Sequence, residues 1–196
     1  MEEKELTLLD HAIIFATKAH SGTTRKGTNV PYIVHPIEAA AIVSAMTDDE
    51  EIIAAAVLHD VLEDTEATRE DLLVRFGRRI TELVENESED KRKNLPAALT
   101  WKTRKQETIT FLETRASTEA KMLALADKLA NLRAIHRDQC IIGDRVWERF
   151  NEKDKRMHAW MYRSIAKALG ELSNHPTWQE YNRLVKEVFG EEANES

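Results

Sequence analysis

An apolar run, Ala54–Leu58, is followed at once by four ionisable side chains: His59, Asp60, Glu63 and Asp64. On one continuous helix each residue advances ~100° about the axis, so these four side chains would share one patch of surface. Burying three carboxylates and an imidazole beside alanine and valine is costly unless a cation neutralises them. The stretch therefore predicts a divalent metal held by His59 and Asp60, with Glu63 and Asp64 left for proton transfer.

Glycine and proline are sparse, with six glycines and four prolines in 196 residues. Few breaks favour long helices, and no segment shows the alternation of apolar and polar residues typical of a strand. We therefore expect an all-α protein with one domain over 1–196, a core over about 6–136 and C-terminal helices over about 144–190. One expected helix starts after Asp48 or Asp49 and carries His59 and Asp60, and the segment 68–85 is expected to be helical with a break at Gly77. The other expected helices span about 6–20, 36–46, 101–116, 118–136, 153–172 and 178–189. The charged stretch 86–96 is expected to be a surface loop.

The formal net charge of −7 argues against a protein that binds a nucleic acid polymer. Basic residues are nevertheless clustered, and the first cluster is Arg25-Lys26 in the first expected loop. An acidic protein with a local basic loop could bind a small polyanion. Two later clusters, within 91–93 and 102–105, fit a solvated charged surface better when taken alone.

Cys140 is the single cysteine, which excludes an internal disulfide and suits a reducing compartment. No apolar run approaches the ~20 residues that span a bilayer. We therefore expect a cytoplasmic protein without a membrane partner.

A second aspartate, Asp127, lies in the alanine-rich segment 122–132, and Asn131 follows it by one helical turn on the same face. An aspartate on a buried face needs a partner. Lys128 is a poor partner because it points about 100° away on the same helix. A metal ion is one alternative, and a salt bridge between helices is the other.

His35 lies between an apolar stretch and Pro36, so we expect it to be fixed and partly buried. Pro36 favours an extended conformation at His35 and a helix that begins at Pro36 itself. Taken alone, His35 could be a loop residue bonded to backbone. Together with the other three candidates it would complete a mixed nitrogen and oxygen site, with room for water, that suits Mn²⁺, Fe²⁺ or Zn²⁺ better than Ca²⁺.

The order of these motifs resembles that of the HD-domain superfamily of metal-dependent phosphohydrolases, which implies an HD-domain helical bundle. The motifs are His35-Pro36, His59-Asp60 with Glu63-Asp64-Thr65, and Asp127-Lys128 with Asn131. More closely, the chain resembles the hydrolase domain of the bifunctional alarmone synthetase/hydrolases and their single-domain relatives, the small alarmone hydrolases. That resemblance covers about 6–135 and rests on Arg25-Lys26, Pro31–Pro36, Leu58–Thr65 and Phe76-Gly77.

The resemblance implies roles for two sets of residues. Four side chains would hold one divalent ion, usually Mn²⁺: His35, His59, Asp60 and Asp127. A carboxylate pair would activate the attacking water or relay its protons: Glu63 and Asp64.

The resemblance also implies a nucleotide site. Arg25 and Lys26 match the basic pair near the phosphates, and Asn131 matches a residue close to the sugar. Tyr162 or Trp160, in a C-terminal segment similar to that of many single-domain members, could stack on the base. Aromatic residues at helical spacing are more often core residues, so packing is the alternative role.

The leading hypothesis is a stand-alone hydrolase that removes the 3′-diphosphate of guanosine tetra- or pentaphosphate, because 196 residues leave no room for synthetase and regulatory domains. Its partner would be a small-molecule nucleotide, and the oligomeric state stays open. One alternative is an HD phosphohydrolase for another nucleotide, such as an adenosine alarmone, the 2′-phosphate of NADPH or a nucleoside monophosphate. Another is a nucleotide-binding domain without turnover, against which the intact Glu63-Asp64 pair argues.

Overall fold

The computed structural model describes residues 5–92 and 94–191. Within these ranges the secondary structure is helical, apart from one isolated bridge between Thr24 and Pro31. The prediction of an all-α protein is confirmed. Among residues 5–92 and 94–191, no helix combines the length and the apolar composition of a membrane-spanning segment.

The chain forms two compact units. Of the described residues, the first unit contains 5–90 together with Ser117–Asp127, and the second contains 91–92, 94–116 and 128–191. The long helix α7 (Thr118–Ile142) begins in the first unit and continues into the second. The single domain over 1–196, with its core over about 6–136, stays a prediction.

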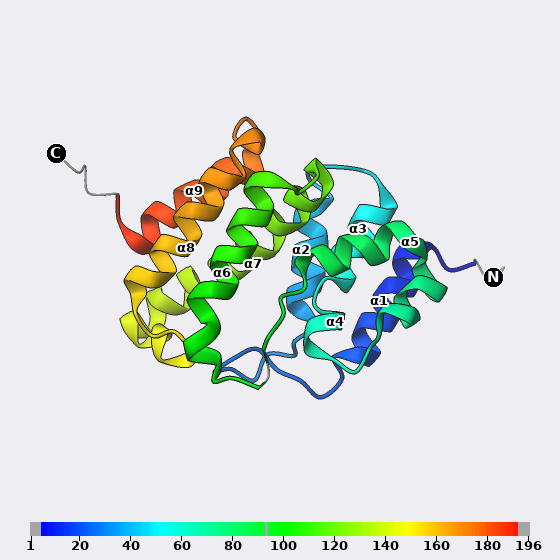
Figure 1. The fold of residues 1–196 in the computed structure, drawn as a ribbon, viewed down its shortest axis with the longest axis horizontal. Coiled ribbons are helices and arrows are strands. Elements are labelled where there is room, and N and C mark those ends of the chain that lie inside the picture. The colour runs from blue at the N-terminus through cyan, green and yellow to red at the C-terminus, as the bar shows by residue number, and fades with distance from the viewer. Residues whose placement is uncertain (1–4, 93, 192–196) are drawn as a thin grey trace. The chain divides into compact units, whose positions relative to one another are not determined.

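The first unit is built around α3 (Glu50–Leu58). Its helices are α1 (Leu8–Ala19), α2 (Val34–Val43), α3, α4 (Val61–Asp64), α5 (Arg69–Glu87) and the start of α7. Helices α1, α2 and α5 all pack on α3 (Figure 1). The reason is visible in the sequence, because every residue of Ala54–Leu58 is buried and the alanines let neighbouring helices approach closely.

Polar side chains fix where these helices begin. Thr7 caps α1 and Thr68 caps α5, each in a reciprocal capping box with an aspartate three residues later. Asp49 caps α3 by accepting a hydrogen bond from the backbone N–H of Glu51 at 3.0 Å. These caps satisfy backbone donors that have no partner within the helix.

The chain bends between α3 and α4, at His59 and Asp60. Helix α3 ends at Leu58, Asp60 has φ −97° and ψ −3°, and α4 begins at Val61. The prediction that His59, Asp60, Glu63 and Asp64 share one continuous helix is therefore wrong. The imidazole Nδ1 of His59 lies 2.8 Å from the carbonyl oxygen of Ala56, so the side chain competes for an acceptor at the end of the helix.

His35 lies inside a helix rather than in an extended segment. Helix α2 starts at Val34, so His35 and Pro36 occupy its first turn. The predicted extended conformation of His35 and the predicted start at Pro36 are wrong. The first-turn N–H groups have no acceptor within a helix, so the missing N–H of Pro36 breaks no hydrogen bond there.

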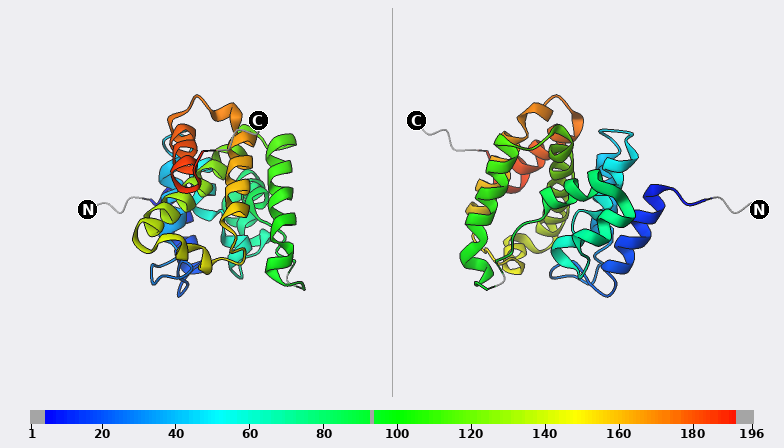
Figure 2. Two further views of the ribbon diagram at one scale, coloured as in Figure 1. Left: turned by 90° about the vertical axis from the view of Figure 1, so that its left-hand side faces the viewer. Right: turned by 45° about the vertical axis from the view of Figure 1, so that its right-hand side comes forward.

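The second unit contains the remaining helices: α6 (Ala97–Thr114), the later part of α7, a 3-10 helix (Gly143–Arg149), α8 (Lys155–Ala168), a 3-10 turn (Gly170–Leu172) and α9 (Pro176–Phe189). Helix α8 packs on both α6 and α9 (Figure 2). Helix α7 continues past its expected end at 136 to Ile142, and Gly143, with φ 63°, follows it directly.

Other expected boundaries shift as well, among them the start of α6, which is Ala97 rather than about Trp101. The predicted helix over 153–172 is instead α8 followed by the 3-10 turn, and α5 continues to Glu87. The loop expected over 86–96 is therefore shorter at its start. Residue 93, in that loop and in the second basic cluster, lies outside the described residues.

Candidate metal centre

The bend between α3 and α4 presents the imidazole of His59 with a defined tautomer. Its side chain is buried, and its Nδ1 lies 2.8 Å from the carbonyl oxygen of Ala56. A carbonyl oxygen can only accept, so Nδ1 carries the hydrogen and donates it. When the ring is neutral it therefore presents the lone pair of Nε2, as a metal-ligating histidine does.

The imidazole of His35 faces that lone pair from the first turn of α2. The two Nε2 atoms lie 3.2 Å apart, and the rings meet edge to face at an interplanar angle of 77°. His35 is 3% exposed, and its Nδ1 is buried without a hydrogen-bond partner among the described residues. Two nitrogen lone pairs at this distance repel each other unless a proton or a metal ion lies between them.

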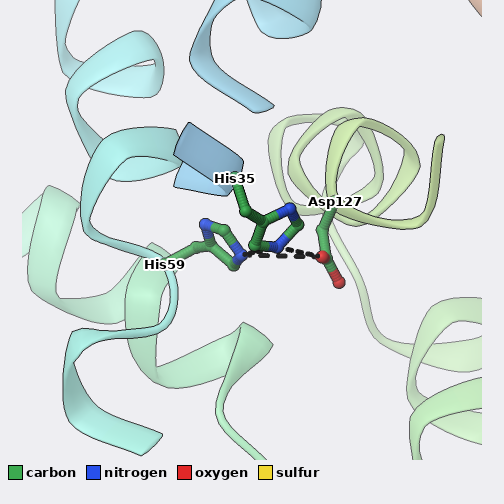
Figure 3. A group of neighbouring side chains, drawn as sticks. All are labelled: His35, His59 and Asp127. Atoms are coloured by element: carbon green, nitrogen blue, oxygen red, sulfur yellow. Dashed lines mark hydrogen bonds and ion pairs between the residues drawn. The ribbon is translucent and has the colours of Figure 1, made fainter. Parts of the chain in front are cut away.

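Two carboxylates complete the cluster. Asp127 Oδ1 lies 3.0 Å from His35 Nε2 and 3.5 Å from His59 Nε2. Asp60 Oδ2 lies 3.0 Å from His59 Nε2 and 3.4 Å from His35 Nε2. The ligand atoms of His35, His59 and Asp127 all lie within 4.8 Å of one another, and Figure 3 shows these three side chains pointing together. The structure thus brings the four predicted ligands together.

The electrostatics of the cluster favour a bound positive charge. Burial acts to lower the pKa of His59, but the Asp60 and Asp127 carboxylates outweigh it and raise that pKa well above its ordinary value. Burial acts to raise the pKa of Asp60, but His59 and His35 hold it well below its ordinary value. Two imidazole nitrogens and two carboxylates form a donor set that fits a divalent transition metal. This cluster is a candidate divalent-metal site.

The two predicted catalytic carboxylates lie on α4, directly after the bend. Glu63 is half-buried, and its Oε2 accepts a hydrogen bond from the backbone N–H of Glu89 at 3.1 Å. Asp64 is exposed, and its Oδ2 lies 3.0 Å from the hydroxyl of Tyr32. The catalytic roles of Glu63 and Asp64 stay predictions.

Tyr32 is a site residue that the sequence analysis missed. Its hydroxyl lies 2.7 Å from Asp60 Oδ2 as well as 3.0 Å from Asp64 Oδ2. Burial, together with the negative charges of Asp60 and Asp64, raises the pKa of Tyr32, so the hydroxyl keeps its proton and donates. The sequence did contain one signal. Tyr32 lies three residues before His35, and a partly buried tyrosine hydroxyl near a candidate ligand needs a hydrogen-bond partner.

The first loop brings Arg25, one of the predicted phosphate-binding pair, to Tyr32. The bridge between Thr24 and Pro31 closes the loop, and the N–H of Arg25 donates to the carbonyl oxygen of Val30 at 2.9 Å. The guanidinium carbon of Arg25 lies 5.5 Å from the centroid of the Tyr32 ring, within the range of a cation–π contact. Lys26 is exposed in the same loop.

The other predicted nucleotide contacts belong to the second unit. Asn131 is half-buried on α7, one turn after Asp127. Tyr162 is 3% exposed on α8, and its ring stacks on Phe189 with centroids 5.5 Å apart. Tyr181 also donates its hydroxyl hydrogen to the carbonyl oxygen of Tyr162 at 2.9 Å. This arrangement favours the packing role for Tyr162, and its contact with a nucleotide stays a prediction.

A family model described as the HD domain matches residues 12–145, a segment that contains the whole cluster. The chain belongs to the HD-domain family. The resemblance drawn from the sequence motifs is thereby confirmed.

Several curated HD-domain relatives are much longer than the segment they share with this protein. The bifunctional (p)ppGpp synthase/hydrolase SpoT of Escherichia coli K12 is 43% identical over 88 residues, which are 45% of this chain and 12% of SpoT. The GTP pyrophosphokinase rsh of Brucella ovis is 37% identical over 130 residues, which are 65% of this chain and 17% of rsh. The shared segment is thus less than a fifth of either relative.

Two solved structures match this HD-domain protein over most of its length. A metazoan ortholog of SpoT, described as hydrolysing ppGpp, superposes with a TM-score of 0.77 at 25% identity, covering 96% of this chain and 99% of that one. The lmo0812 protein of Listeria monocytogenes EGD-e superposes with a TM-score of 0.70 at 32% identity, covering 80% of this chain and 99% of that one.

Proposed function

We propose that this HD-domain protein is a metal-dependent guanosine-3′,5′-bis(diphosphate) 3′-pyrophosphohydrolase. The observation that carries the reaction class is the convergence of two histidine Nε2 atoms and two aspartates beside a further carboxylate pair. The substrate is carried over from the relatives, since both SpoT and its metazoan ortholog are described as acting on ppGpp. In the reaction, the water oxygen bonds to the phosphorus nearest the sugar, the bond from that phosphorus to the 3′ oxygen breaks, and the 3′ oxygen takes up a proton. The products are pyrophosphate and GDP or GTP.

Each part of the site has a task in this proposal. A divalent cation held by His35, His59, Asp60 and Asp127 would polarise phosphoryl oxygens and make water more acidic. Glu63 and Asp64 accept the proton of the attacking water and pass it on. An ionised carboxylate can act as this general base because its oxygens have lone pairs that take up a proton.

The Arg25-Lys26 loop binds the substrate phosphates. Arg25 can bind a phosphate through two parallel hydrogen bonds, whereas Lys26 contributes a point charge. This local positive charge also offsets the repulsion between a polyanionic substrate and a chain of net charge −7. Asn131 contacts the sugar in the same proposal.

The finer assignments are part of the proposal as well. The proposed ion is Mn²⁺, one per chain, which the family resemblance implies and with which the mixed nitrogen and oxygen donor set is compatible. The single Cys140 supports the cytoplasm as the compartment. The match to 99% of the metazoan ortholog supports one functional domain over 1–196.

The test is a substrate panel with the metal-stripped and the Mn²⁺-loaded protein. We expect release of pyrophosphate and GDP from ppGpp only after Mn²⁺ is added, and slower turnover of ppApp, NADPH and dAMP. Equal activity with and without the metal contradicts the mechanism. An Mn²⁺-loaded protein that turns over another nucleotide but not ppGpp contradicts the substrate.

A further inference from the structure

The hydroxyl of Tyr32 connects two carboxylates with different predicted roles. It lies 2.7 Å from Asp60 Oδ2, in the candidate metal centre, and 3.0 Å from Asp64 Oδ2, in the predicted proton-transfer pair. Both carboxylates are acceptors when ionised, and the hydroxyl is the donor that they share. A shared donor holds the two negative groups close to each other despite their repulsion.

The ring of Tyr32 contacts two further parts of the site. The imidazole of His35 meets it edge-on, with centroids 5.9 Å apart and an interplanar angle of 80°. The guanidinium of Arg25 lies 5.5 Å from its centroid. One rigid aromatic side chain therefore joins the candidate metal ligands, the predicted proton-transfer carboxylate and the predicted phosphate-binding arginine.

The ring of a buried histidine, His20, packs against the ring of Tyr32. His20 directly follows α1 and is 3% exposed, and its ring lies 4.8 Å from that of Tyr32 with a tilt of 32°. Its Nε2 is buried without a hydrogen-bond partner among the described residues. Burying that nitrogen without a partner is unfavourable. The favourable contact of this side chain is the packing of its ring on Tyr32.

We infer that Tyr32 is a positioning residue that holds the Asp64 carboxylate in place beside Asp60, and that the ring of His20 holds Tyr32. This inference rests on the proposed function, because it assigns Asp64 to proton transfer in that reaction. Tyr32 acts through Asp64 and therefore affects turnover more than substrate binding.

Tyr32→Phe tests the hydroxyl, because phenylalanine keeps the ring contacts with His20, His35 and Arg25. At saturating Mn²⁺ we expect kcat for ppGpp to fall about 10–100-fold, the size of effect typical of groups that orient a site. KM should stay within about threefold of the wild-type value, and titration with Mn²⁺ should still give one ion per chain. A kcat within about twofold of the wild-type value overturns the inference.

A double-mutant cycle asks whether Tyr32 acts through Asp64. If it does, adding Tyr32→Phe to Asp64→Asn should lower kcat by less than about twofold beyond Asp64→Asn alone. Multiplicative losses in the double variant overturn the positioning role, since they mean that Tyr32 works independently of Asp64.

Two substitutions separate the ring of His20 from its nitrogens. His20→Phe keeps an aromatic ring and should keep kcat within about twofold, whereas His20→Ala should lower kcat several-fold. Phe15→Leu on α1 is the matched control, because Phe15 packs on Phe76 and its loss should lower Tm without lowering kcat. Equal losses of kcat in His20→Phe and His20→Ala overturn the ring contact as the basis of support.

A readout without substrate separates this inference from the proposed function. Crystal structures of the Mn²⁺-loaded wild-type and Tyr32→Phe proteins should show the Asp64 carboxylate displaced in the variant, and an unmoved carboxylate overturns the inference. A wild-type protein that binds Mn²⁺ but does not hydrolyse ppGpp overturns the proposed function instead, and the position of Asp64 still decides the role of Tyr32.

Discussion

At the scale of single residues, the candidate metal centre depends on two imidazole nitrogens that lie 3.2 Å apart. The carbonyl oxygen of Ala56 holds the Nδ1 hydrogen of His59, so the Nε2 of that ring can accept either a second proton or a metal ion. Asp60 and Asp127 stabilise positive charge at this point and raise the pKa of His59. A metal ion and a proton therefore compete for one position, so metal binding should strengthen as the pH rises.

The metal-binding and proton-transfer roles are separated by one pair of variants. Asp127→Ala should lose Mn²⁺ and reduce ppGpp hydrolysis to background, because it removes a buried ligand. Glu63→Gln keeps an oxygen that can accept from the N–H of Glu89, so it should retain one Mn²⁺ per chain while kcat falls about 100–10,000-fold. Metal analysis after gel filtration and initial rates measure both effects.

The control for this pair is Glu82→Gln, an exposed glutamate of α5 paired with Arg78. It should match the wild-type protein in both measurements. Loss of metal from Glu63→Gln would make Glu63 a ligand, and an unchanged kcat would exclude it from proton transfer.

At the scale of elements, three of the four candidate ligands lie at the ends of helices, and Asp127 lies within α7. The bend after α3 presents His59 and Asp60, and the first turn of α2 presents His35. Helix α3 is held by its neighbours α1, α2 and α5. Helix α5 itself contains a kink at Gly77, where φ is 79° and ψ is 175°.

Gly77→Ala tests that kink. This backbone conformation is essentially restricted to glycine, and a Cβ there would meet no atom within 4 Å, so the expected cost of about 1–3 kcal/mol is backbone strain alone. Urea denaturation measures the change in unfolding free energy. Gly170→Ala, at a glycine without positive φ and with equally open space, is the control and should be neutral or slightly stabilising. Equal effects of the two substitutions would contradict the strain.

The second unit contains a buried histidine that makes stability depend on pH. His158 packs on Trp101, Trp147 and Phe150, and burial lowers its pKa. A lowered pKa in the folded state means that this stability is present above the unfolded value of about 6.5 and is lost as the pH falls toward the folded value.

We therefore expect Tm to fall less between pH 7 and pH 5 in His158→Phe than in the wild-type protein, both measured in EDTA. The aromatic replacement keeps the ring packing but cannot take up a proton. A pH dependence of Tm that is the same in both proteins would show that His158 does not cause it.

For the whole molecule, the sequence was sufficient for the fold class and the family, because long apolar repeats and few breaks specify helices and the spaced His and Asp motifs specify the HD domain. The four candidate ligands were also found in the sequence, since buried charges beside alanine need a partner. Backbone detail at the site was not predictable from periodicity. At the bend after Leu58 the His59 side chain contacts the carbonyl oxygen of Ala56, a contact that periodicity does not encode, and the helical His35 is compatible with Pro36 because a first turn tolerates proline.

The partners of Tyr32 could not be predicted for a different reason. Its role depends on two carboxylates that lie 28 and 32 residues away in the chain, and only the folded chain brings them to one hydroxyl. The packing of Tyr162 against Phe189 is likewise a property of the folded second unit. Local patterns identify the residue types of such contacts but not their partners.

The most direct test of the central claim is X-ray diffraction from Mn²⁺-loaded crystals at a wavelength where manganese scatters anomalously. We predict one anomalous peak per chain, within bonding distance of His35 Nε2, His59 Nε2, Asp60 and Asp127, and no such peak in crystals of Asp127→Ala. A peak elsewhere in the chain, or the same peak in Asp127→Ala, would contradict the claim that these four side chains hold one metal ion.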